Sequence, residues 1–436
     1  MKRIYVFILI LFSTFNINAQ SLYFPPLTEN DWDTISPSSL GYCQSEIDSL
    51  YAFLDSNSTK AFILLKDGKI VLEQYFGTHT QNSNWQWASA GKTITSFMVG
   101  IAQQEGYLSI TDTTSNYLGN GWTSCSPAQE EKVTIRHQLT MTSGLDDGVE
   151  NNHCTLNTCL IYMADAGSRW AYHNAPYTLL DNVIETATGF TLNQYTTQKL
   201  KNLTGMKGAF VSLDYDNVYF SNARSMARFG LLILNKGNWN GNQIMTDTAY
   251  FNQMVSTSQS LNKSYGYLWW LNGKSSFMMP SLQMVFPGSL CPNAPSDMIT
   301  AMGKDGQFLN VVPNQNLVWV RMGEEPNNLP VPFLLNDAIW EYVNNLVCSS
   351  TSINNQPCNT YSVQLFPNPA SNILNIKSDR PLSIVEIFNV QGQLIKKINT
   401  QNKETSISIS DLSKGLFFVK TSLPNGYQWT GKLIKE

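Results

Sequence analysis

The stretch WQWASAGKT, residues 85–93, holds a serine and a lysine three positions apart at the start of a helical pattern. Apolar residues recur at three- and four-residue spacing, which predicts an amphipathic helix over 89–104. Residues three apart lie on one helix face, so the Lys92 amine can reach the Ser89 hydroxyl. A serine needs a base to become a good nucleophile, and a desolvated lysine can serve as that base. We take Ser89 as the candidate nucleophile and Lys92 as its candidate base, with helix N–H groups near the oxyanion.

Two short patterns suggest this chemistry, a serine three positions before a lysine and a Y-x-N element, and neither is specific when it stands alone. The run SLNK at residues 260–263 also places a serine three positions before a lysine. The companion is a Y-x-N element that begins at Tyr172 and ends at Asn174. Its tyrosine can relay a proton to a leaving group, and its amide can orient Lys92 and a substrate carbonyl. The same pattern occurs at residues 215–217, 250–252 and 342–344.

Strand signals stand on both sides of a long helical region. Two apolar-rich runs, 59–65 and 69–76, flank Asp67-Gly68, a strong hairpin signal. Besides the helix at 89–104, helices are predicted over 45–54, 135–141, 176–188, 192–203, 223–235 and 331–347. Later strands are predicted over 266–271, 297–302, 308–312 and 317–322. We therefore expect an α+β domain whose sheet is built from both ends, with a helical insertion.

The composition changes after Cys348. Residues 349–362 include a stretch rich in Ser, Thr and Asn without apolar periodicity, as in a linker. From 363 to 436, short β-like runs alternate with turn residues about every ten positions, which predicts a small all-β, Ig-like sandwich. The runs are 373–376, 384–388, 393–398, 406–409 and 416–421.

The N-terminus has the features of an export signal. Lys2 and Arg3 precede an apolar run over 4–12, and residues 17–19 end in a small residue, so we expect a signal peptide at 1–19. That run is too short to span a bilayer, and we expect no transmembrane segment in the mature chain. A net charge of −4 without a Lys/Arg run argues against nucleic-acid binding.

Seven cysteines fit a protein exported to an oxidising compartment. Cys154 with Cys159, and Cys348 with Cys358, are the plausible disulfide pairs. The remaining cysteines are Cys43, Cys125 and Cys291, and the odd count leaves at least one thiol free. A metal site is not expected, because the chain lacks a CxxC element.

Five segments, in order, resemble those of the serine β-lactamase-related family, which includes class C β-lactamases, D-alanyl-D-alanine carboxypeptidases, and related esterases and amidases. They are residues 85–93, 133–145, 170–177, 223–230 and 265–270. The resemblance implies a β-lactamase/DD-peptidase-like fold over residues 20–348, an antiparallel sheet flanked by helices with an added helical region. It maps the family's nucleophile, base and tyrosine onto Ser89, Lys92 and Tyr172, and implies no metal or organic cofactor.

The third family motif departs from its usual form. Many members carry Lys-Thr-Gly or His-Thr-Gly on the strand beside the nucleophile, where this chain has AMGKDG over 301–306. Residues 301–303 fit that place better than 304–306, and backbone N–H groups near Gly303 or Lys304 can still serve an oxyanion. The group that reads a substrate carboxylate is then missing. This disfavours β-lactams and D-Ala-D-Ala, and leaves esters and small amides, as in the branch resembling 6-aminohexanoate-dimer hydrolases.

The C-terminal segment resembles the sorting domain of the Bacteroidetes type IX secretion system. The resemblance rests on residues 365–370, 390–392, 412–417 and 432–436. It implies the type IX machinery as a partner, and a secreted or surface-attached protein. We expect a secreted serine hydrolase that cleaves esters or amides. The alternatives are a penicillin-interactive D-Ala-D-Ala carboxypeptidase or β-lactamase, and a catalytically silent surface binding module.

Some other residues have a functional and a structural interpretation. An aromatic set could line an acyl pocket or pack in the core: Trp85, Trp87, Trp170, Tyr177, Trp269 and Trp270. His137 and His173 are expected to pack rather than to act as bases. His79 and His153 lie in expected loops and carry no functional signal.

Overall fold

The computed structural model describes residues 22–436, except 29–30, 325–331, 349–361, 391 and 425–427. The expected signal peptide at 1–19, almost all of the expected linker, and Cys358 therefore lie outside the described residues.

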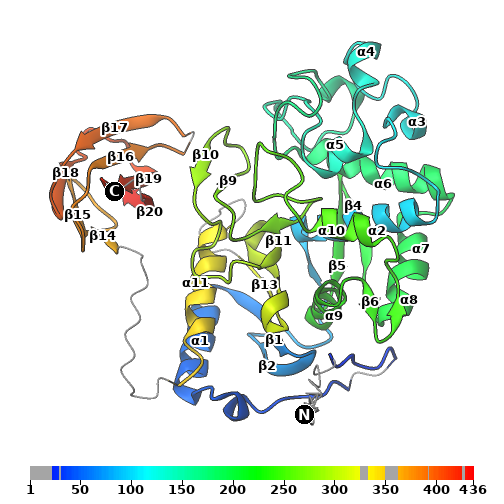
Figure 1. Cartoon of the computed structure of the whole chain (residues 1–436), viewed down its shortest axis with the longest axis horizontal. Helices are drawn as coiled ribbons and strands as arrows, with labels where there is room; N and C mark the ends of the chain where they lie inside the picture. Colours follow the sequence, from blue (N-terminus) through cyan, green and yellow to red (C-terminus); the bar gives the residue numbers. More distant parts are fainter. Residues whose placement is uncertain (1–21, 29–30, 325–331, 349–361, 391, 425–427) are drawn as a thin grey trace, which may run out of the picture.

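A six-stranded antiparallel sheet joins the two ends of the first 348 residues (Figure 1). Its strands, in spatial order, are β2 (Lys69–Tyr75), β1 (Thr59–Lys66), β13 (Leu317–Gly323), β12 (Gln307–Val312), β11 (Ile299–Gly303) and β8 (Trp270–Leu271). Strand β1 pairs directly with β13, which confirms a sheet assembled from both ends. Asp67 and Gly68 both have positive φ, as the tight β1–β2 turn requires.

Helices cover both faces of this sheet (Figure 1). They are α1 (Gln44–Ser56) and α11 (Phe333–Asn344) on one face and α9 (Ala223–Leu234) on the other. Successive strand residues point to opposite faces. In β13, Val318 lies against Gly230 of α9, whereas the Trp319 ring contacts Trp340 of α11. Strands β12 and β13 are therefore buried throughout.

The helical region lies between β2 and β8 in the chain and is confirmed. Besides α9, its helices are α2 (Lys92–Gln104), α3 (Ser115–Leu118), α4 (Pro127–Glu130), α5 (Ile135–Leu139), α6 (Asn174–Thr188), α7 (Leu192–Thr196), α8 (Asn202–Thr204) and α10 (Thr248–Met254). Short 3₁₀ turns, and the π turn η4, complete the helical elements: η1 (Pro37–Leu40), η2 (Ala88–Gly91), η3 (Asn157–Cys159), η4 (Thr197–Lys201), η5 (Lys304–Gly306) and η6 (Pro313–Gln315).

In the described part of residues 22–348, three small sheets accompany the main one. They are β3 (Trp85–Gln86), β5 (Asp216–Ser221) and β4 (Ala209–Leu213); β6 (Asn238–Trp239) and β7 (Asn242–Gln243); and β9 (Ser276–Met278) and β10 (Val285–Pro287). The strand expected over 266–271 is only two residues long. Leu268 has a positive φ of 60°, which breaks extended geometry just before β8.

Helix α2 differs in two respects from the amphipathic helix that the sequence predicts over residues 89–104. Ser89 lies in the 3₁₀ turn η2, and the α-helix begins at Lys92. Helix α2 is also buried all round from Lys92 to Ala102, so it is central rather than half-exposed. Two of its threonine hydroxyls form hydrogen bonds inside the protein, Thr93 Oγ1 to the Ala90 carbonyl and Thr95 Oγ1 to Asp181.

The C-terminal residues form the expected all-β sandwich. One sheet holds β14 (Val363–Phe366), β15 (Ile373–Ser378) and β18 (Glu404–Ser408). The other holds β17 (Leu394–Asn399), β16 (Ile384–Phe388), β19 (Gly415–Ser422) and β20 (Gln428–Lys435). Their inward residues make a separate apolar core that includes Leu374, Val385 and Leu433.

The disulfides agree with one expected pair and correct the other. Cys154 bonds to Cys159 as expected. Cys348 bonds to Cys43, so the expected pairing of Cys348 with Cys358 is wrong. The two segments meet because the Cys43 N–H donates to Leu346 and the Cys348 N–H to Gly41, at 2.9 and 2.8 Å. Cys125 and Cys291 are free thiols.

The side chain of Arg321, near the end of strand β13, links several chain segments by hydrogen bonds. Its fully buried guanidinium donates to Thr59 Oγ1 at 2.9 Å and to the carbonyls of Gly306, at 2.7 Å, and Glu324, at 2.9 Å. Removal of this donor set would leave several buried acceptors without partners, each of which costs about 1–3 kcal/mol.

We expect Arg321→Met to lower the free energy of unfolding by at least about 3 kcal/mol, because methionine fills the space but donates no hydrogen bond. Urea denaturation of the oxidised protein measures this change. The same substitution at the exposed Arg136 is the control and should change stability by about 0.5 kcal/mol or less. Equal effects of the two substitutions would contradict the role of Arg321.

Candidate active site

Ser89 is held in the short turn η2, which is clamped from two sides. The Trp87 N–H donates to the Tyr219 carbonyl on β5 at 2.8 Å, and the Trp87 indole donates to Ser221 at 2.7 Å. Ala88 adopts a positive φ of 46°, which is uncommon for a residue with a Cβ. This conformation of Ala88 comes directly before the candidate nucleophile, at a place that β5 fixes.

The end of strand β11 closes the other side of η2. A Cβ at Gly303 would lie 2.4 Å from the Trp87 carbonyl and 3.1 Å from the Ser89 nitrogen. Only glycine therefore lets the strand approach the Ser89 backbone this closely. Lys304 follows in η5 with an exposed side chain. Residues 301–303 therefore occupy the strand position beside the candidate nucleophile.

Lys92 lies one turn along from Ser89, as the spacing predicts. Its Nζ donates a hydrogen bond to the Ser89 Oγ at 2.9 Å. The side chain is buried, and its Nζ lies 4.0 Å from the ring centre of Tyr177 and 5.4 Å from that of Tyr172. In the part of the chain that the structure describes, no carboxylate lies within ion-pair distance of this Nζ.

This environment makes the Lys92 amine easier to deprotonate. Burial lowers the pKa of Lys92 to about 7, and the more distant charges of Asp216 and Asp181 oppose that change. At neutral pH a substantial fraction of Lys92 is then the neutral amine, which can accept a proton from Ser89. In the other S-x-x-K match, Lys263 instead donates to Ser275 at 3.1 Å, and Ser260 is exposed.

Tyr172 is the member of the Y-x-N matches that reaches Ser89. Burial raises the pKa of the Tyr172 phenol, and a side-chain hydrogen bond with Ser89 opposes part of that rise. The phenol therefore keeps its proton at neutral pH. It can pass a proton along a hydrogen bond, but it is poorly suited to being the resting base.

Helix α6 carries three polar side chains on the face whose Tyr177 ring lies against Lys92 Nζ. Asn174, Tyr177 and Asp181 are spaced by three and four residues and so share one helix face. Burial raises the pKa of Asp181 to about 7, while hydrogen bonds from Asn217 and Thr95 lower it in part. The carboxyl of Asp181 was not singled out by the sequence, because no motif includes it.

The structure adds two further residues that the sequence did not identify. His153 Nδ1 lies 2.7 Å from Asp216 Oδ1, and Asn174 Nδ2 lies 3.1 Å from His153 Nε2. The only signal in the sequence is the Tyr215-Asp216-Asn217 match to the Y-x-N pattern, which is not specific. His173 is buried with neither ring nitrogen bonded among the described residues. His137 bonds to Thr134 as a packed residue.

The aromatic set is largely core. The Trp87, Trp170, Trp269 and Trp270 side chains are fully buried, and Trp85 is half-buried at the edge of η2. The ring of Trp270 stacks on that of Tyr172, with centres 5.9 Å apart. Trp270 thus fixes the tyrosine ring, and Tyr177 supports the Lys92 amine.

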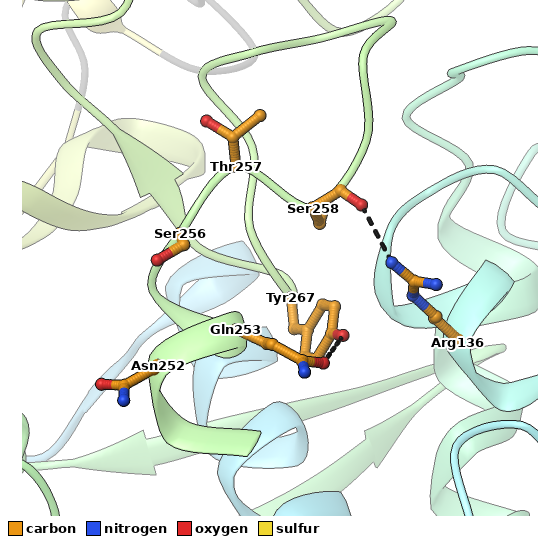
Figure 2. A pocket seen from close by; sticks show the side chains of 7 residues that line it. All are labelled: Arg136, Asn252, Gln253, Ser256, Thr257, Ser258 and Tyr267. Atoms are coloured by element: carbon orange, nitrogen blue, oxygen red, sulfur yellow. Dashed lines mark hydrogen bonds between the residues drawn. The ribbon is translucent and has the colours of Figure 1, made fainter. Parts of the chain in front are cut away.

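A separate surface hollow contains none of the sequence-predicted site residues (Figure 2). It is lined by Arg136, Asn252, Gln253, Ser256, Thr257, Ser258 and Tyr267. The guanidinium of Arg136 donates to the Ser258 carbonyl, and the hydroxyl of Tyr267 to Gln253. Several polar groups that line this hollow are therefore already hydrogen-bonded to one another.

The described residues contain no helix that is long and apolar enough to cross a membrane. Within the same residues, no group of three or more His, Cys, Asp or Glu side chains is arranged to hold a metal ion.

Solved structures share the fold. A putative 6-aminohexanoate-dimer hydrolase from Bacillus anthracis is 20% identical with a TM-score of 0.52, covering 75% of this chain and 89% of its own. A putative beta-lactamase from Bacteroides dorei is 15% identical with a TM-score of 0.55, covering 70% and 99%. A family VIII carboxylesterase is 14% identical with a TM-score of 0.52, covering 70% and 99%. The sequence matches none of the curated proteins compared with it.

Two family models match the sequence. The model of the secretion system C-terminal sorting domain matches residues 364–436, which marks the protein as secreted or surface-located through the type IX machinery. The beta-lactamase model matches residues 58–344, more than half of the 436 residues. The chain therefore belongs to the beta-lactamase family, whose fold is that of penicillin-binding-protein-like serine hydrolases.

Proposed function

We propose that the protein is an exported serine hydrolase that cleaves esters or small amides through an acyl-enzyme on Ser89. The observation that carries the proposal is the 2.9 Å hydrogen bond between Ser89 Oγ and a buried Lys92 whose pKa is lowered to about 7. The proposed domain limits are a signal at 1–19, the hydrolase at 20–348, a linker at 349–362 and the sorting domain at 363–436.

The steps follow from the protonation states. Neutral Lys92 accepts the Ser89 proton, and Ser89 Oγ bonds to the substrate carbonyl carbon. Backbone N–H groups at Ser89 and near Gly303 or Lys304 stabilise the resulting oxyanion. The proton passes from Lys92 through Tyr172 to the leaving oxygen or nitrogen as the carbonyl–leaving-group bond breaks. Water then attacks the acyl-enzyme, gives a proton to Lys92, and releases the acid while Ser89 regains its proton.

The proposed substrate class is supported by the residues that lie beside Ser89 on β11. Ala301 and Met302 are buried apolar residues where many relatives carry a cation or an imidazole, and Lys304 is exposed. A bound carboxylate would lack a partner there. This supports esters and neutral amides over β-lactams and D-Ala-D-Ala peptides.

Ser89→Ala should abolish labelling by a fluorophosphonate probe and lower ester turnover at least about 10³-fold, because the nucleophile is gone. Ser260→Ala, in the second S-x-x-K match, is the matched control and should behave like the wild type. Gel fluorescence of the full chain reads the labelling. Labelling of Ser89→Ala at the wild-type rate would refute the proposal.

The rate of labelling should rise with pH about a midpoint near 7, because only the neutral form of Lys92 accepts the serine proton, and that form increases as the pH passes the lowered pKa. A stopped labelling series from pH 5 to 9 measures this profile. Lys92→Arg should remove the activity, since arginine keeps its proton. A flat profile, or an active Lys92→Arg, would exclude Lys92 as the base.

A substrate panel separates the proposal from its two alternatives. We expect turnover of short p-nitrophenyl esters or nylon-type amides, and turnover of a chromogenic cephalosporin roughly 30- to 150-fold slower, since an unpaired carboxylate costs about 2–3 kcal/mol. Efficient labelling by fluorescent penicillin would favour the penicillin-interactive alternative. Inertness toward the whole panel and toward fluorophosphonate would favour a silent binding module.

A further inference from the structure

Three chain segments meet at His153. Its Nδ1 lies 2.7 Å from Asp216 Oδ1 at the start of β5, and its Nε2 lies 3.1 Å from Asn174 Nδ2 at the start of α6. The next residue, Cys154, is tied to Cys159 by a disulfide, and the His153 N–H donates to Asn151 Oδ1 at 3.0 Å. The histidine is therefore held from both sides of the ring and from its own backbone.

The partners of the ring determine where its proton lies. A carboxylate only accepts hydrogen bonds, so His153 donates from Nδ1 to Asp216. The atom facing its Nε2 is the Asn174 amide nitrogen, which can only donate, so Nε2 is the acceptor of that hydrogen bond. The other amide hydrogen has a partner in Asn152 Oδ1 at 3.3 Å. Both hydrogens of Asn174 Nδ2 are thus used, which fixes the orientation of the amide.

Because both hydrogens of the Asn174 amide already have partners, its oxygen is the group that can still form a hydrogen bond in the proposed active site. Asn174 shares its helix face with Tyr177, whose ring lies 4.0 Å from Lys92 Nζ. The charge of Asp216, at the far end of the same chain of hydrogen bonds, acts on Lys92 as well. Asn174 therefore lies on the face of α6 that carries the Tyr177 ring next to Lys92.

We propose that His153, held by Asp216, is a positioning residue that fixes the Asn174 amide with its oxygen toward Lys92. That oxygen accepts a hydrogen bond from the Lys92 ammonium formed when Ser89 loses its proton. The reversed amide would point N–H groups at the same ammonium and oppose proton transfer. The inference rests on the proposed function, because it assigns the residue that orients the amide next to the proposed base.

The test measures the maximal rate of fluorophosphonate labelling and the probe concentration that gives half of it, on the full chain. His153→Leu removes the acceptor and should lower the maximal rate about tenfold, with the half-saturating concentration changed by less than about twofold. His153→Gln places an amide oxygen near the position of Nε2 and should stay within about threefold of the wild type. Melting curves should coincide, since His153 is 43% exposed.

A double-mutant cycle separates positioning from a direct effect. In an Asn174→Ala background, His153→Leu should change the maximal rate by less than about twofold. The same tenfold loss in that background, an equal loss in His153→Gln, or no loss in His153→Leu would overturn the inference. Wild-type protein that is not labelled at all would instead overturn the proposed function, so the two failures are distinguishable.

Discussion

The proposed active site is organised around the buried Lys92 amine, which contacts no carboxylate among the residues that the structure describes. A lysine placed in water would be charged at every physiological pH, and burial without an ion partner makes its neutral form accessible. In this protein the ring of Tyr177 and the hydroxyl of Ser89 surround the Lys92 Nζ, at 4.0 Å and 2.9 Å. Asp181 and Asp216 act only from a greater distance, so they moderate the effect of burial without cancelling it.

The rest of the fold buries Lys92 and holds the turn that carries Ser89 in place. Helix α2 is buried on all sides, so Lys92 cannot extend to solvent. The turn that holds Ser89 is pinned by β5 on one side and by Gly303 on the other. Strand β11 can reach that turn only because the central sheet aligns it with β12 and β13, whose order is set by pairing between the two ends of the domain.

Sequence reasoning recovered what depends on local spacing. The Ser89–Lys92 contact follows from helical geometry, and the hairpin at Asp67-Gly68 follows from turn chemistry. It failed where contacts join distant segments. The partner of Cys348 is 305 residues away, and no local sequence pattern near either cysteine predicts the disulfide. His153 was dismissed as a loop residue, because its partners Asp216 and Asn174 meet it only after β5 and α6 have packed.

The bond between Cys43 and Cys348 also changes the topology of the molecule. Together with the polypeptide it closes a ring that contains every strand of the central sheet and every residue of the proposed site. A peptide bond broken anywhere in residues 349–361 would free the sandwich from the ring without opening it. The detached ring would have no loose end at α11 from which to unravel. In the chain-entropy view, closing a loop this long lowers the entropy of the unfolded chain and so raises the free energy of unfolding by roughly 5–6 kcal/mol.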